Sequence, residues 1–154
     1  MDKVIYEKKG VKQIQVNEQG DYIEIDLMDI ELPFKVENTR KELIRQNNIF
    51  KNRCKAIEKQ YKDNEELIRV NQYKAEIDFC NKCREVLDGF LGKGACHKIF
   101  GDTNRYGMFD QYFEQLADVL SGLEMDIKAI KEELMARYKK NTEVIKWYTQ
   151  QKWK

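Results

Sequence analysis

Hydrophobic and polar residues alternate along the first third of the chain, as they do in a β-strand that buries one face. The apolar members of the two alternating runs are Ile14, Val16, Ile23, Ile25 and Leu27. Between the runs, residues 17–21 supply the glycine and Asx residues that a hairpin turn uses for positive φ angles. The pattern predicts a β-hairpin over about residues 11–28, with residues 4–6 as a candidate third strand. An isolated hairpin is marginal in water, so its apolar face must lie on the helices that follow or on another copy.

After the chain's only proline, apolar residues recur at alternating spacings of three and four, which is the pattern of helices packed lengthwise. Thr39, followed three residues later by Glu42, has the spacing of a capping box. We therefore predict helices over about residues 38–62, 64–91 and 106–139. The stripe residues are Leu43, Asn47, Phe50, Cys54, Ile57 and Tyr61, then Val70, Tyr73, Ile77, Cys80, Leu87 and Leu91, then Phe109, Phe113, Leu116, Leu120, Leu123, Ile127, Ile130 and Leu134.

These patterns predict a mainly α fold of the α+β kind: an N-terminal β-hairpin followed by a bundle of three to four helices, the last one long. About 30 residues of helix, at 1.5 Å per residue, make a rod on the order of 45 Å. A rod that long extends past a small core, so we expect its far half, after Gly122, to project or to meet a partner. The predicted partner-binding residues are Leu123, Ile127, Ile130, Leu134, Trp147, Tyr148 and Trp153.

Composition adds a domain boundary to this picture. Charged residues make up 36% of the 154, which favours long solvated helices in one domain. The formal net charge of +1 argues against nucleic acid or membrane binding over the whole surface. Residues 137–154, however, carry 6 basic and 1 acidic side chains, a net charge of +5. We predict a single domain over residues 1–140 and a basic, aromatic tail over residues 141–154. Nucleic acid is a disfavoured partner because this basic footprint is local.

The compartment follows from the cysteines and from the N-terminus. Four cysteines, with no apolar signal-peptide core at the start of the chain, fit a reducing cytosol better than a disulfide framework. No apolar run approaches the roughly 18 residues of a membrane span. The sequence therefore predicts a cytoplasmic protein with no membrane partner.

Candidate chemistry is concentrated around residues 80–97. Cys80, Cys83, Cys96 and His97 are of the types that bind zinc, but adjacent Cys96 and His97 diverge and cannot easily complete one tetrahedron. Cys80 also lies on the predicted apolar stripe, so we favour packing for these cysteines. Carboxylates fall on polar helix faces, and no catalytic constellation is visible. We predict no enzyme, cofactor or metal. The alternative hypothesis is a small zinc- or nucleic-acid-binding regulator that uses the cysteines and the basic tail.

A short stretch between the second and third predicted helices carries a family resemblance. It reads LGKGACHKIFGD over residues 91–102, with Gly92 and Gly94 ending one helix, and the next helix opens as YGMFDQYF over residues 106–113. Together with the hairpin and the charged helices, the LGxG and FGD-like motifs resemble the small tail assembly chaperones of long-tailed phages and prophages of Gram-positive bacteria. The likeness runs over roughly residues 20–140.

The resemblance implies a non-enzymatic role in the cytoplasm of the bacterial host. Members of that family bind the long tape measure protein and keep it soluble until tail tube subunits polymerise round it. They often self-associate, so the resemblance implies a homo-oligomer, and a frameshift-extended form is thought to engage the tail tube protein. Another phage tail or head-tail connector protein is the alternative within the same class.

Overall fold

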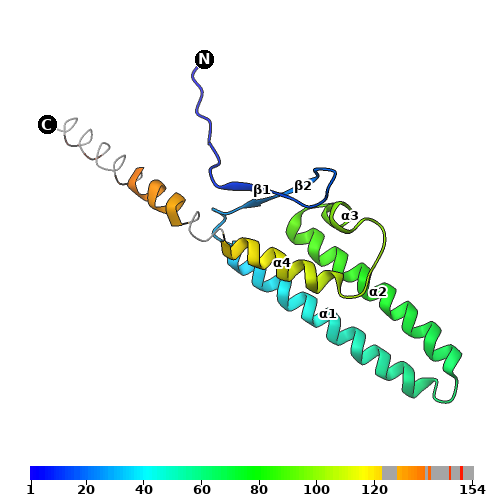
Figure 1. Ribbon diagram of the computed structural model, residues 1–154. Helices are drawn as coiled ribbons and strands as arrows, with labels where there is room; N and C mark the ends of the chain where they lie inside the picture. The colour runs from blue at the N-terminus through cyan, green and yellow to red at the C-terminus, as the bar shows by residue number, and fades with distance from the viewer. Residues whose placement is uncertain (123–127, 138, 140–145, 147–149, 151–154) are drawn as a thin grey trace.

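The computed structural model describes residues 1–122, 128–137, 139, 146 and 150 (Figure 1). In chain order the elements are β1 (Val11–Gln15), β2 (Tyr22–Asp26), α1 (Leu32–Gln60), α2 (Glu65–Leu91), α3 (Ala95–Phe100) and α4 (Met108–Gly122). Residues 128–137 are also helical. The helices α1 and α2 form a long antiparallel hairpin, α4 lies along one end of it, and the two strands lie beside α3 and α4. The predicted fold class, mainly α with an N-terminal β-hairpin, is confirmed.

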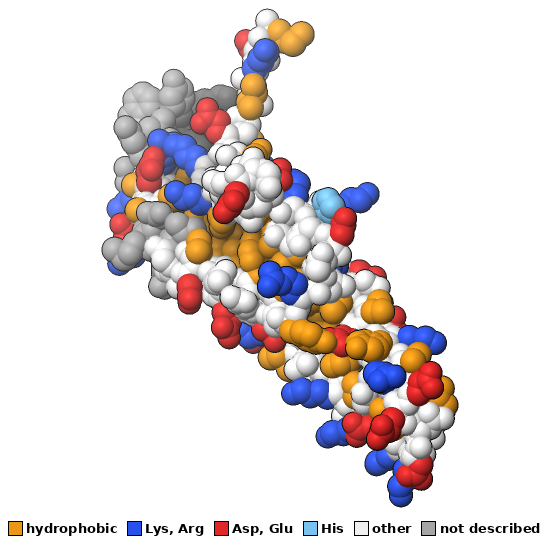
Figure 2. Space-filling view, turned by 45° about the vertical axis from the view of Figure 1, so that its right-hand side comes forward, with side chains coloured by type: hydrophobic (Ala, Val, Ile, Leu, Met, Phe, Trp, Pro, Cys, Tyr) orange, Lys and Arg blue, Asp and Glu red, His pale blue; other side chains and the backbone are white. Residues whose placement is uncertain are grey.

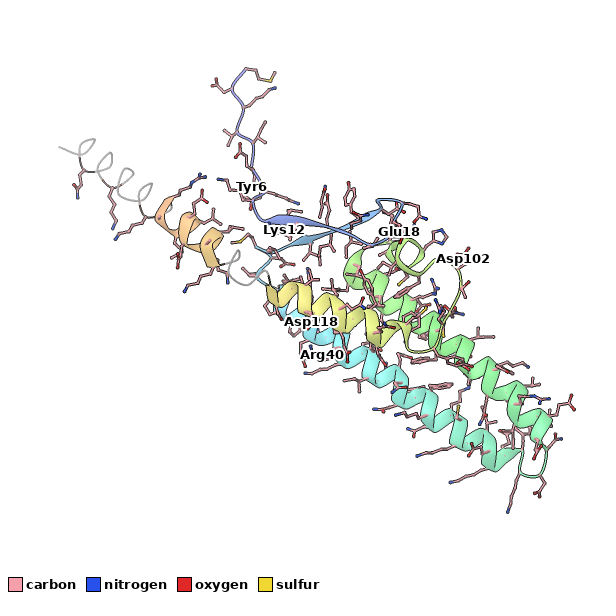
Figure 3. The ribbon with its side chains drawn as sticks, viewed as in Figure 1. Tyr6, Lys12, Glu18, Arg40, Asp102 and Asp118 are labelled. Atoms are coloured by element: carbon pink, nitrogen blue, oxygen red, sulfur yellow. The ribbon has the colours of Figure 1, made fainter. Side chains whose placement is uncertain are left out.

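The β-hairpin is antiparallel, and Ile14 faces Ile23 across it. Its apolar face is buried as predicted, with Ile23, Ile25 and Leu27 only 3–5% exposed. The turn is tied to α3, because the Asn17 side chain donates to the Lys98 carbonyl at 2.9 Å. Figure 3 shows the same turn, marked by Glu18, beside α3 and the Asp102 loop. The hairpin face therefore lies on the helices of its own chain.

Residues 4–6 form no strand, so that prediction is wrong. Their side chains are 74–101% exposed. The cause lies at Gly10, whose carbonyl accepts a hydrogen bond from the Leu27 N–H at 3.0 Å. There φ is +86°, and a Cβ would lie 2.7 Å from Met28 Cγ. Only glycine fits this turn, and it directs the preceding residues away from the sheet.

Helix α1 starts at Leu32, six residues before the predicted start, and the predicted capping box at Thr39 is wrong. Proline in the first helical turn needs no N–H partner, so it begins this helix instead of closing the preceding region. Thr39 lies inside the helix, where its hydroxyl donates to the Lys35 carbonyl at 2.7 Å. The break between α1 and α2 is where the sequence places it: Asn64 caps α2 by accepting from the Leu67 N–H at 3.2 Å.

The core consists of two clusters of buried side chains. The first joins α1, α2, α3 and α4 through Leu43, Cys83, Leu87, Cys96, Met108, Phe109 and Phe113. The second seats β2 on the helices through Ile23, Ile25, Leu27, Leu91, Ala95 and Leu116. Aromatic contacts link these layers: the Phe100 ring lies 5.4 Å from the rings of both Phe109 and Tyr112. Both clusters lie in the half of the molecule that α3 and α4 cover.

The long last helix is described in two pieces. Met108–Gly122 and residues 128–137 are helical, and residues 123–127 lie outside the described residues. In the described part of the chain, no helix combines the length and the apolar character that crossing a membrane requires.

Candidate functional site

The stripe predicted for α2 divides into a buried half and an exposed half. Leu87 and Leu91 are buried as predicted, whereas Val70, Tyr73 and Ile77 are 40%, 57% and 56% exposed. The prediction of a buried line is wrong for these three residues. Helix α1 packs on a different face of α2. Helix α4 begins at Met108 beside the second half of α2, so it does not cover the first half.

We call the exposed residues Val70, Tyr73, Ile77 and Tyr106 the α2 stripe. Tyr106, at the end of the loop before α4, is 88% exposed. A depression of about 220 Å³ lies at this end of the stripe, and Tyr73, Ile77, Cys80 and Tyr106 are among its lining residues. Figure 2 shows hydrophobic side chains over the middle of the elongated body, whereas charged side chains crowd the tip of the helical hairpin. An apolar row with a concave end is typical of a protein interaction surface.

The loop that carries Tyr106 is anchored on α2 by one arginine. Arg84 donates from Nε to Asn104 Oδ1 at 2.8 Å, and from its two terminal nitrogens to the carbonyls of Gly101 at 3.0 Å and Thr103 at 3.4 Å. Its guanidinium carbon also lies 5.9 Å from the centre of the Phe100 ring. A single planar group thus fixes the path of the chain from α3 to α4.

Asp88, one turn after Arg84 on α2, holds the start of α3. Its Oδ1 accepts from the Cys96 N–H at 2.8 Å, as an N-terminal cap does. Sequence reasoning missed both residues, because each looks like one more charge on a solvated helix face. Their spacing of four with opposite charges is also that of an ordinary surface pair.

A second hollow surface lies between α1 and α2. Two depressions of about 620 and 430 Å³ share Glu42, Glu85 and Val86, and we call them together the α1/α2 cleft. No residue of α4 is among the described lining residues, so the cleft lies on the face of the helical hairpin that α4 leaves open. Its apolar lining residues are Phe34, Ile49, Phe50, Ala75, Phe79, Val86 and Phe90. An ion pair of 2.7 Å between Arg53 and Asp78 joins the two helices near its far end.

Most of the predicted partner-binding residues, namely Leu123, Ile127, Trp147, Tyr148 and Trp153, lie outside the described residues. Ile130 is half-buried, and its Cδ1 lies 3.5 Å from the position of a Cβ on Gly10. Leu134 is 36% exposed. Lys9 Nζ lies 3.5 Å from Glu133 Oε1. The helical residues 128–137 therefore contact the start of the β-hairpin through one face.

The cysteines are free thiols in packing positions. Cys83 and Cys96 are 1% exposed, and burial raises the pKa of each thiol to about 12. Burial also raises the pKa values of Cys54 and Cys80. His97 diverges from Cys96 as predicted: its Nδ1 lies 2.8 Å from Asp102 Oδ1, and its side chain is 70% exposed. Among the described residues, no three His, Cys, Asp or Glu side chains are grouped to hold a metal ion.

Comparison with known proteins gives one match. A family model described as a family of unknown function, DUF6673, matches residues 19–153. No curated protein and no solved structure matches the chain.

Proposed function

We propose that this chain, which belongs to the DUF6673 family, is a non-catalytic phage tail assembly chaperone. In this proposal it binds the tape measure protein in the cytoplasm of the bacterial host and keeps that client soluble while the tail tube assembles. The observation that carries the proposal is the α2 stripe, an apolar row left exposed beside a long helix. The phage role itself rests on the resemblance of residues 91–102 and 106–113 to that class of chaperone.

The α2 stripe has the spacing that a helical client needs. Val70, Tyr73 and Ile77 are separated by three and four residues, so they form one line along the axis of α2. An amphipathic client helix laid against that line buries its own apolar face by helix-on-helix packing. Tyr73 and Tyr106 flank the depression at the end of the line. Aromatic residues in such positions are the usual energetic centres of an interface.

Weak binding at many positions suits a client that must later be released. A tape measure protein is long, so several copies of the chain can bind along it, and self-association of the copies increases their avidity. Tail tube subunits that polymerise round the client then displace the copies one at a time. Binding and release of this kind need no single high-affinity site, so a short apolar stripe on each copy is sufficient.

The raised thiol pKa values also favour a non-catalytic role. A cysteine nucleophile reacts as the thiolate, and burial disfavours the thiolate of Cys83 and Cys96. Cys80, the cysteine nearest the α2 stripe, also has a raised pKa because of burial. The cysteine beside the stripe thus provides contact area and not an activated thiol.

Co-expression with the adjacent tape measure gene tests the proposal. The wild-type chain should move the client from the pellet to the soluble fraction, and Ile77→Glu should abolish this effect by placing a charge on the stripe. Ile44→Glu is the matched control, because Ile44 on α1 is 55% exposed and Ile77 is 56% exposed. The proposal would be contradicted if the client stayed aggregated with the wild-type chain. It would also be contradicted if Ile44→Glu and Ile77→Glu lowered the soluble fraction of the client equally.

Cysteine alkylation maps the contact independently. Cys80 lines the depression at the end of the α2 stripe, whereas Cys54 lies on α1 and is not among the described residues that line it. The bound client should slow alkylation of Cys80 and leave the rate at Cys54 unchanged, as measured by mass spectrometry of tryptic peptides. Equal protection of both cysteines would place the client elsewhere.

A further inference from the structure

Residues 1–9, which we call the N-terminal arm, carry apolar side chains that the body of the molecule leaves uncovered. Val4, Ile5 and Tyr6 are 101%, 74% and 85% exposed. The arm projects from the body beside the start of β1 (Figures 1 and 2). Valine, isoleucine and tyrosine are residue types that favour strands. The arm is therefore a strand-forming segment that has no strand beside it in the described part of its own chain.

Contacts at the junction of the arm and the hairpin direct the arm away from its own sheet. The Gly10 carbonyl accepts from the Leu27 N–H at 3.0 Å, so the hairpin ladder continues up to the arm. Lys9 Nζ lies 3.5 Å from Glu133 Oε1, which ties the junction to the helical residues 128–137. An antiparallel return to β1 of the same chain would need a reversal at this junction, where these contacts already set the path of the backbone.

The outer edge of β1 is open to such a segment. Among the described residues the sheet has only two strands. The Val16 N–H donates to the Asp21 carbonyl at 2.9 Å, and hydrogen-bonded residues of an antiparallel ladder alternate along each strand. The N–H and C=O groups of β1 that face away from β2 therefore belong to Val11, Gln13 and Gln15. Unpaired groups of this kind are a template for another strand.

The apolar face of β1 is also less completely covered than that of β2. Ile14 and Val16 are partly buried, whereas Ile23 and Ile25 are only 4% and 5% exposed. A depression of about 560 Å³ lies next to the end of β1, and Val16 is the only hairpin residue among its described lining residues. The helix-facing side of β1 therefore has room for the side chains of a further strand.

We propose that residues 3–7 of the arm add as a third strand to the outer edge of β1 in a second copy of the chain. Each segment has five residues, so full antiparallel overlap places Ile5 opposite Gln13 of the second copy. In this register, the arm residues whose N–H and C=O groups face the open groups of β1 are Lys3, Ile5 and Glu7.

The same register covers the apolar side of the arm. Residues directly opposite each other point to the same face of a sheet, so Val4 and Tyr6 turn toward the helices, as Ile14 does. Antiparallel orientation also brings Lys3 to the end of the sheet where the turn carries the exposed carboxylate of Glu18. A parallel orientation would place this lysine at the opposite end and lose the attraction.

A second copy is the occupant because every copy carries both parts, an uncovered arm and an open β1 edge. The exchange requires no change in the folded body, since it uses only exposed side chains and outward-facing backbone groups. The proposal stands apart from the chaperone function, because the α2 stripe takes no part in it. A chain that failed to exchange arms would still have its α2 stripe available to a client.

Substitutions at Ile5 test the exchange without touching the core. Ile5→Pro removes the N–H that bonds to the second copy, whereas Ile5→Thr keeps this donor and a β-branched side chain. Sedimentation analysis should show the wild-type chain and Ile5→Thr as assemblies of two or more copies, and Ile5→Pro as a monomer. The helical circular dichroism signal should be the same for all three, which excludes unfolding as the cause.

Disulfide trapping tests the register. In a background of Cys54→Ala and Cys80→Ala, a chain with Ile5→Cys should form a disulfide with a second chain that carries Gln13→Cys. Opposite residues of a hydrogen-bonded pair have Cα atoms about 5.5 Å apart, within disulfide range. Glu24→Cys is the matched control, because Glu24 is exposed and pairs with Gln13 across the hairpin but lies one strand further from the arm. It should give little covalent heterodimer on a non-reducing gel.

Four results would overturn the proposal. The first is a wild-type chain that stays monomeric up to its solubility limit. The second is equal assembly of Ile5→Pro and Ile5→Thr, because the copies would then meet elsewhere. The third is an equal disulfide yield at Gln13→Cys and Glu24→Cys. The fourth is assembly that occurs only when a client is added, since a client strand would then occupy the edge of β1.

Discussion

The two halves of α2 carry the same spacing of apolar residues and have opposite environments. In the second half, Leu87 is fully buried and Leu91 is 7% exposed, because α3 and α4 fold over them. In the first half, Tyr73 and Ile77 are more than half exposed, because α4 starts beyond their reach. Three-four spacing therefore shows that a helix has an apolar line, and the neighbouring elements decide whether that line becomes core or interface.

The largest expected effect is on the free energy of unfolding, which substitutions in the two halves of α2 should change by very different amounts. Leu87→Ala leaves a cavity in the fully packed half and should cost about 2–5 kcal/mol of the free energy of unfolding. Ile77→Ala removes a side chain that is 56% exposed and should change stability by no more than about 0.5 kcal/mol. Urea unfolding followed by circular dichroism measures both. Similar losses for the two variants would mean that the first half of α2 is covered in solution.

Arg84 lies where the covered half meets the exposed half. Arg84→Ala removes three hydrogen bonds to the loop over residues 101–104 and should cost about 1–3 kcal/mol. Hydrogen exchange should accelerate in that loop and at the start of α4, and stay unchanged in α1. Arg69→Ala, on the exposed half of the same helix, is the control. If exchange in the loop stays slow in Arg84→Ala, other contacts hold the loop.

Gly89 tests the comparison of the two halves of α2, because it lies in the covered half and yet has free space where a side chain would be. Gly89→Ala should raise the free energy of unfolding by about 0.5–1 kcal/mol, since nothing obstructs the added methyl group and alanine favours the helix. Gly94→Ala should do the reverse, because Gly94 has a φ of +78°. Thermal unfolding of the two variants checks the opposite signs. A loss of stability in Gly89→Ala would mean that the α1/α2 cleft is closed at this point.

The last effect comes from the thiols of the covered half and is negligible near neutral pH. The folded pKa values of Cys83 and Cys96, about 12, lie above the ordinary value of 9.0, so the neutral thiols favour folding below pH 9. This contribution is lost as the pH rises from 9 toward 12. A Cys83→Ala variant should show a flatter decline of stability over that range. At pH 8, a thiol reagent should modify Cys54 and Cys80 well before Cys83 and Cys96. Equal labelling rates would contradict the burial of the last two.

The sequence predicts the parts of the fold that depend on local pattern. The hairpin face and the end of α2 at Gly92 both follow from spacing and turn residues, and the structure confirms them. Of the α1 stripe, Leu43 and Ile57 are buried. Helix α3 was missed because six residues are too few to establish a helical period. The α1 start was misplaced because proline is compatible with both a helix end and a first helical turn.

The candidate surfaces were less accessible to prediction, because they depend on where distant elements end. The exposure of Tyr73 is set by the position of Met108, and the role of Arg84 is set by carbonyls 17–19 residues later in the chain. The α1/α2 cleft arises from two helices whose polar faces look ordinary when each is considered alone. Among the residues that line the cleft, Gly89 differs from its neighbours in the sequence because it is a glycine inside a helix.

The position of the β-hairpin on later parts of the chain also determines when its apolar face can be buried during synthesis. The apolar face of β2 is covered by Leu91, Ala95 and Leu116, and the turn is tied to the Lys98 carbonyl. The strands leave the ribosome first, yet the residues that shield them follow up to 93 positions later, counted from Ile23 to Leu116. At roughly 5–20 residues per second, Ile23 and Ile25 wait between about 5 and 19 seconds for Leu116 to be synthesised. During that interval the apolar face of β2 is open to any chaperone that binds unfolded chains.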